Sequence, residues 1–205
     1  LFLLTLLTMT AFAANSLLNR AGLAEGAIGP AGFAVIRVIS GAVMLWVLMV
    51  VGQKAVPKRR TPDWNSAIAL AAYLLGFSFA YVALDAGLGA LVLFAIVQVT
   101  MFTGAVRAGD RIPVLRWGGM GVSLMGLAYL VWPSENVQLP LLPLILMTTA
   151  AIGWGIYSLI GRRAAQPLQA TAWNFIYAAP IVLIVTLPFI WGEVFSAPGV
   201  LLAIT

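Results

Sequence analysis

The sequence predicts an all-α protein that crosses a membrane several times. Hydrophobic residues make up 62% of the 205 residues and charged residues only 8%, and a water-soluble domain of this composition would expose mostly apolar surface. The apolar residues form blocks of about 20 with few or no charges, long enough to cross a hydrocarbon core of about 30 Å as helices. Positive charge is concentrated in every second loop between these blocks, which is typical of a polytopic membrane protein.

The first four membrane-spanning helices are expected at residues 1–19, 31–51, 65–84 and 88–106. The first block is too long, and too closely followed by further spans, to be a cleaved signal peptide. Prolines and glycines separate the blocks because they interrupt helices and favour turns. These interruptions are Gly29-Pro30 before the second span, Pro57 and Pro62 before the third, and Ala86-Gly87 before the fourth.

The next three helices are expected at residues 114–132, 141–160 and 170–190, with an eighth opening near residue 198. Tryptophans at the ends of several spans support these boundaries, since amphipathic rings favour the membrane–water interface. The tryptophans are Trp64, Trp117, Trp132 and Trp191. The interrupting prolines are Pro113, Pro133, Pro140, Pro167 and Pro198.

The charged residues of the loops predict the orientation of the chain. The loops after the third, fifth and seventh spans carry Asp85, Glu135 and Glu193 but no positive charge. Because positive charge in short loops marks the cytoplasmic side, we expect a multi-pass protein of the inner (plasma) membrane with a cytoplasmic N-terminus. Nine of the 11 Lys and Arg residues lie in or beside the alternate loops, namely Lys54, Lys58, Arg59, Arg60, Arg107, Arg111, Arg116, Arg162 and Arg163.

Composition excludes several kinds of chemistry. The chain has no His and no Cys, so it offers no thiol nucleophile, disulfide, or Cys or His metal site. It also lacks the phosphate-binding loop pattern of nucleotide hydrolases. We therefore expect no cofactor and no metal. The net charge of +5 is accounted for by membrane topology, and no nucleic-acid partner is expected.

An internal repeat relates the sixth expected span to the first. Residues 153–162 repeat the pattern of residues 11–20, with small and aromatic residues at the start and a Ser-Leu-aliphatic-x-Arg end. A repeat unit of five helices has an odd number of crossings, so its second copy must insert upside down, as in many transporters. We expect a first unit over residues 1–136 and a truncated second unit over residues 137–205. The sequence would then hold seven complete spans and the start of an eighth, out of ten in two complete units.

Four segments, taken in order, resemble a known family across the whole chain. They are residues 27–37 with Gly29-Pro30 and Arg37, the small-residue hairpin 83–91, Gly109-Asp110-Arg111 with the Gly-rich segment 117–127, and Gly153-Trp154-Gly155. In these segments the chain resembles the EamA-like branch of the drug/metabolite transporter superfamily. The resemblance implies an inverted-repeat carrier with ten helices that moves small organic solutes, often amino acids or other metabolites, outward. The chain departs from the family pattern at Gln98, where a mid-helix Pro is common, and at Asp110, where Glu is usual.

Polar and aromatic residues inside the expected spans are the candidates for a solute pathway, because a polar group in lipid must find a partner or water. If the repeats face each other across a cavity, Asn15 and Phe12 should converge with Trp154 and Tyr157. Asn19 is expected to cap the end of the first helix. The full set of candidates is Asn15, Arg37, Tyr73, Tyr81, Gln98, Trp154, Tyr157, Asn174 and Tyr177.

Each candidate also has a structural interpretation that the sequence leaves open. Gln98, flanked by Phe94 and Phe102, either binds solute or hydrogen-bonds a neighbouring helix. Arg37 either attracts a substrate carboxylate or extends its side chain to the interface, and the family resemblance favours a structural or gating role. The tyrosines and Asn174 either line a cavity or join helices.

The combined expectation is a secondary transporter of small organic solutes, such as amino acids or related metabolites, that works by alternating access and exports its solute. The expected partners are a small organic solute and the lipid bilayer, with a homodimer as an open alternative. No carboxylate lies in the middle of a span, so the coupling ion is left undefined. Two other classes rank lower: an intramembrane enzyme such as a lipid-group transferase, which would need clustered acid–base groups, and a non-transporting membrane subunit.

Overall fold

The computed structural model describes residues 2–24, 26–53, 61–131 and 140–204. In this part of the chain the secondary structure is helical, apart from one isolated bridge between Ile28 and Phe195. The helices, in chain order, are α1 (Phe2–Ala24), α2 (Pro30–Gln53), α3 (Trp64–Ala80), α4 (Ala86–Arg107), α5 (Val114–Val131), α6 (Leu141–Gly161), α7 (Pro167–Thr186) and α8 (Ala197–Ile204).

Each expected span coincides with one helix, and the differences lie at helix ends. The first helix continues to Ala24, five residues beyond the expected end. The third helix ends early, at Ala80, and just after this end Arg20 donates hydrogen bonds of 3.0 Å to the carbonyl oxygens of Tyr81 and Val82. Helix α7 begins at Pro167, since proline fits the first helical turn, where its missing N–H is not needed.

Five helices are long and apolar enough to cross a membrane: α1, α2, α4, α6 and α7. The apolar helix α3 has 17 residues, and it lies between α2, α6 and α7 rather than alone in lipid. The protein is thus an all-helical, multi-pass membrane protein by the length and composition of its helices. The charged residues Glu25, Lys54, Lys58, Arg59, Arg60 and Glu135, and the expected boundary at 136/137, lie outside the described residues.

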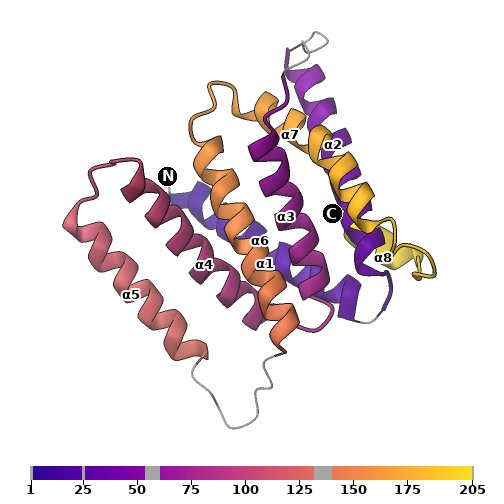
Figure 1. Cartoon of the computed structure of the whole chain (residues 1–205), viewed down its shortest axis with the longest axis horizontal. Coiled ribbons are helices and arrows are strands. Elements are labelled where there is room, and N and C mark those ends of the chain that lie inside the picture. The colour runs from indigo at the N-terminus through magenta and orange to yellow at the C-terminus, as the bar shows by residue number, and fades with distance from the viewer. Residues whose placement is uncertain (1, 25, 54–60, 132–139, 205) are drawn as a thin grey trace.

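The helices alternate in direction through the bundle. The C-terminal ends of α2, α4 and α6 lie at the upper end in Figure 1, and those of α1, α3 and α7 lie at the lower end. Arg107 ends α4, Arg111 follows it, Arg116 lies in the first turn of α5, and Arg162 and Arg163 follow α6, so all five lie near helix ends at the upper end. These positions match the alternation that the loop charges predict.

Helix α3 occupies the centre of the bundle and packs against α6, α7 and α2. Glycines bring α3 and α6 close together: a Cβ atom at Gly76 would lie 2.5 Å from the Leu146 carbonyl oxygen, and one at Gly153 would lie 2.6 Å from that of Ala69. Helix α4 packs on α6 and α1, and α2 packs on α7. Helix α5 packs on α4 and lies at the outer edge of the bundle (Figure 1).

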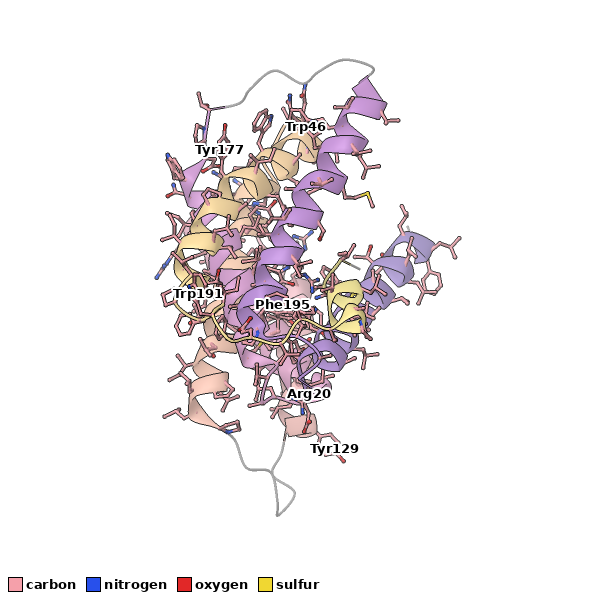
Figure 2. The ribbon with its side chains drawn as sticks, turned by 90° about the vertical axis from the view of Figure 1, so that its right-hand side faces the viewer. Arg20, Trp46, Tyr129, Tyr177, Trp191 and Phe195 are labelled. Atoms are coloured by element: carbon pink, nitrogen blue, oxygen red, sulfur yellow. The ribbon has the colours of Figure 1, made fainter. Side chains whose placement is uncertain are left out.

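A non-helical segment between α7 and α8 clasps the start of α2. The Glu193 carboxylate accepts hydrogen bonds from the backbone N–H groups of Ala31 (3.0 Å) and Gly32 (2.7 Å). Nearby, the Gly29 N–H donates to the Val194 carbonyl oxygen at 3.2 Å. Figure 2 shows this segment crossing the lower part of the bundle between Trp191 and Phe195. These contacts define the outer clasp, residues 193–196 bound to residues 27–32.

Candidate functional site

Four of the expected site residues meet in the interior of the helical bundle. The Arg37 guanidinium on α2 donates through Nη2 to the Asn15 side-chain oxygen on α1. The Asn15 amide nitrogen lies 3.4 Å from the Tyr73 hydroxyl oxygen on α3. The Tyr73 ring packs against the Trp154 ring on α6, with 4.8 Å between centroids. We call Asn15, Arg37, Tyr73 and Trp154 the central cluster.

The central cluster lies well inside the helices that cross the membrane. Arg37 follows the first residue of α2, Pro30, by seven positions, which is about 10 Å at 1.5 Å per residue. Half of the hydrocarbon core is about 15 Å. Tyr73 is buried, whereas Arg37, Asn15 and Trp154 are half-buried and therefore remain partly accessible.

Aromatic rings surround the central cluster on the α6 side. Trp154 contacts Phe12 with 6.2 Å between centroids and Tyr157 with 5.6 Å. The two helices whose sequences repeat therefore place Phe12, Asn15, Trp154 and Tyr157 in one chain of contacts that runs through Tyr73. The sequence pattern could suggest this convergence because the repeat assigns Phe12 and Trp154 to equivalent positions.

Two further residues, Asn19 and Phe33, contact the central cluster, although their roles did not follow from the sequence. Asn19 does not cap α1, because the helix continues to Ala24 and the Asn19 side chain is fully buried. Its amide nitrogen donates to the Asn15 backbone carbonyl oxygen at 2.7 Å, and its Oδ1 has no partner among the described residues. The Phe33 ring lies under the guanidinium, 5.9 Å from Arg37 Cζ, a cation–π distance.

The charge of Arg37 has no anionic partner in the described part of the chain. The ion pairs found there join Arg20 to Asp85 at 3.4 Å and Arg162 to Asp110 at 2.9 Å, both near helix ends. Arg37 does not extend to the interface, since it bonds Asn15 and stacks on Phe33. A cation within a membrane span costs roughly 2.5–3.5 kcal/mol unless it is paired or faces water, so such residues usually serve function.

Tyr81 is separate from the central cluster and lies near the lower end of the bundle. The rings of Tyr73, Phe77 and Tyr81 follow one another along α3, with centroids 5.2 and 4.7 Å apart. The Tyr81 hydroxyl donates to the Ala86 carbonyl oxygen at 3.4 Å, and Arg20 holds the adjacent turn. Tyr81 thus joins α3 to the start of α4. Figure 2 shows Arg20 at this end of the bundle.

Gln98 lies between α4 and α5, away from the central cluster. Its side-chain oxygen accepts a hydrogen bond of 3.0 Å from the Ser123 hydroxyl, which is the helix-joining role that the sequence left open. Gln98 also borders a cavity of about 650 Å³ together with Phe94 and Phe102. Asp110 and Arg162, which form an ion pair, also line this cavity.

Asn174 and Tyr177 lie toward the upper end of the bundle. Tyr177 stacks on Trp173, with ring centroids 5.7 Å apart, and also contacts Trp64. Figure 2 shows Tyr177 and Trp46 at the end opposite Arg20. Asn174 borders a cavity of about 400 Å³ that is also lined by Asp63, and by residues 159–164 at the end of α6.

The central cluster is suited to binding rather than to acid–base chemistry. It combines a fixed cation, an amide, a phenol and an indole, which bind polar solutes through hydrogen bonds and apolar solutes through ring contacts. Within the described segments, no three acidic side chains come together as a metal site. The contact of Glu193 with the start of α2 could not be predicted from the sequence, because its partners are about 160 residues away and no local pattern links them.

No known family model matches the chain. No solved structure matches it either. The chain is 42% identical over 188 residues to an uncharacterized protein of Pseudomonas aeruginosa. The alignment covers 91% of this chain and 64% of the relative, so the chain spans just under two thirds of that relative's length.

Proposed function

We propose that the protein is a secondary transporter of small organic solutes, of the EamA-like kind, which exports its solute by alternating access. The observation that carries the proposal is the central cluster, in which a charged residue and polar residues meet inside a bundle of apolar helices. Polar groups at this depth are unfavourable and rare unless they serve a solute or ion pathway. The cluster draws on α1, α2 and α3 from the first expected unit and on α6 from the second.

The pattern of helix contacts supports two related halves. In the expected repeat, α1 is equivalent to α6, α2 to α7 and α3 to α8. The contact between α1 and α8 then has its equivalent in the contact between α6 and α3, and the contact between α2 and α8 has its equivalent in that between α7 and α3. The contact between α2 and α7 is its own equivalent. Halves related by a two-fold axis in the membrane plane would pack in this way.

Equivalent residues of the two halves support the same relation. Helices α2 and α7 both begin at a proline, Pro30 and Pro167. Phe12 and Trp154 occupy matching places in the repeat, and their rings touch edge to face. Equivalent residues meet in this way only near the axis that relates the two halves.

The two ends of the bundle differ, as expected for a state of alternating access that is open to one side. The outer clasp ties the start of α2 to the segment before α8 at the lower end. At the upper end, a cavity of about 400 Å³ lies between the ends of α3, α4, α6 and α7. We interpret the upper end as cytoplasmic from its arginines, so this conformation is closed outward and more open inward.

Solute counterflow tests the proposal. The purified chain is reconstituted into liposomes loaded with one unlabelled solute from a panel of amino acids, organic acids and amines, and uptake of the same labelled solute is followed. A carrier exchanges internal for external solute, so label should accumulate transiently above its equilibrium level with at least one solute. Protein-free liposomes serve as the control. If the folded protein gives no counterflow with any panel member, the proposed function is wrong.

A further inference from the structure

We propose that the central cluster binds the carboxylate of a small organic acid, with Arg37 as the anion-binding residue and Trp154 and Phe12 as the surface for an apolar or aromatic body. This inference rests on the proposed function, because it names the substrate class of the same site. It also gives Arg37 a role in solute recognition instead of a purely structural one.

The first argument is the balance of charge. Arg37 is a permanent cation, and no carboxylate of the described residues pairs with it. The carboxylates of Asp85 and Asp110 are engaged near helix ends by Arg20 and Arg162. An anionic solute would supply the missing charge, and its binding would replace an unpaired cation by an ion pair.

The second argument is the balance of hydrogen-bonding groups. A guanidinium has five N–H donors, and toward the described residues Arg37 donates one hydrogen bond, to Asn15. Asn15 Oδ1 is already occupied as an acceptor, and its amide nitrogen approaches Tyr73 at the long distance of 3.4 Å. The cluster therefore has more donors than acceptors. A carboxylate is the complementary group, since it only accepts and can take two parallel N–H bonds from one guanidinium.

The third argument concerns the apolar part of the solute. Trp154 and Phe12 are half-buried, and their rings meet edge to face at 6.2 Å. Trp154 packs against Tyr73, which is linked to the guanidinium through Asn15, and Phe12 reaches this side of the cluster through Trp154. Half-buried rings next to an anion site can contact an apolar group attached to the anion by a short linker.

Paired ligands with one body and two head groups test this inference. Binding of radiolabelled 3-phenylpropionate and of its neutral amide, 3-phenylpropionamide, is measured on the purified chain by equilibrium dialysis in detergent. We expect the amide to bind about 10- to 100-fold more weakly, the range given by loss of a charge-assisted hydrogen-bonded pair. Arg37→Gln should lower acid binding to the level of the amide and leave amide binding unchanged.

Two further variants keep the test decisive. Arg111→Gln also removes one positive charge, but from an exposed position outside the cluster, and should leave the preference for the acid intact. Tyr73→Phe removes a single hydroxyl and should weaken acid binding severalfold without affecting the amide, even if Arg37→Gln fails to fold. The inference is overturned if the amide binds as well as the acid, if neither binds, or if folded Arg37→Gln still prefers the acid.

The outcome is separable from that of the proposed function. Acid binding that depends on Arg37, without counterflow of any solute, would support the site and contradict transport. Counterflow that proceeds equally well in the Arg37→Gln variant would support transport and contradict the carboxylate site.

Discussion

Glu193 and Arg37 are two charged residues in different environments: Glu193 contacts the start of α2, and Arg37 belongs to that helix. The Glu193 carboxylate binds the free N–H groups at the start of α2, where the helix dipole favours a negative charge. Arg37 lies farther along the same helix and has an amide and a ring as its partners. The Glu193 carboxylate thus has its hydrogen-bond partners within the fold, whereas Arg37 has no anionic partner among the described residues.

Removal of the Glu193 carboxylate should destabilise the protein. Glu193→Ala leaves two N–H groups of α2 without an acceptor, and we expect the free energy of unfolding to fall by about 1–2 kcal/mol, as for a lost helix cap. Thermal unfolding in detergent measures the change. Asp85→Ala is the control, because the Asp85 side chain is 86% exposed and its ion pair with Arg20 is open to solvent, so the variant should lose little. Equal losses in both variants would show that the outer clasp is not stabilising.

At the residue scale, the sequence could identify the central cluster only in part. Asn15, Arg37, Tyr73 and Trp154 are recognisable because polar or amphipathic residues in apolar spans need partners. Which of the candidates meet one another depends on helix rotation and packing. For that reason Gln98 could not be separated from them in advance, and its bond to Ser123 came only from the structure.

Among the contacts between helices, the one between α3 and α6 forms the aromatic part of the central cluster. It places Tyr73 beside Trp154, and glycines on each helix allow the backbones to approach. Close approach through small residues is a common way to join helices in lipid, where van der Waals packing replaces the hydrophobic effect. The position of the aromatic part of the central cluster therefore depends on Gly76 and Gly153.

A methyl group at Gly153 should disturb this contact. The added Cβ would lie 2.6 Å from the Ala69 carbonyl oxygen and 3.0 Å from the Tyr73 backbone nitrogen, so α3 and α6 must move apart. We expect Gly153→Ala to lower the free energy of unfolding by about 1–3 kcal/mol. Gly118→Ala on α5 is the matched control, because it meets no atom within 4 Å and replaces a poor helix former by a good one. The same unfolding assay applies, and a Gly153→Ala variant as stable as the control would contradict the packing.

At the scale of elements, the sequence predicted which segments are helical more reliably than where they end. Apolar blocks bounded by prolines are visible without any tertiary information. The turn that follows α3 is instead held by Arg20, a residue of another helix. Likewise, α1 extends past Asn19 because its last turns pack against α8 and not because of a local signal.

The whole molecule combines a central helix α3, a closed outer clasp at one end and a cavity at the other. The number of helices, their order and their alternation could be predicted from apolar blocks and loop charges. The inverted relation of the two halves is a stronger statement, which the repeat and the equivalence of helix contacts support. It is the basis of the proposed mechanism, because a site between inverted halves can open to either side.

Labelling of single cysteines tests the inverted relation most directly, since the chain has no native Cys. Ala21→Cys and Ala165→Cys place thiols at exposed positions just after the two repeated segments. Each variant is treated with a membrane-impermeant thiol reagent, in intact cells and in inside-out vesicles. We predict that Ala21→Cys reacts only in intact cells and Ala165→Cys only in inside-out vesicles. Reaction of both variants from the same side would contradict the inverted halves and the transport mechanism built on them.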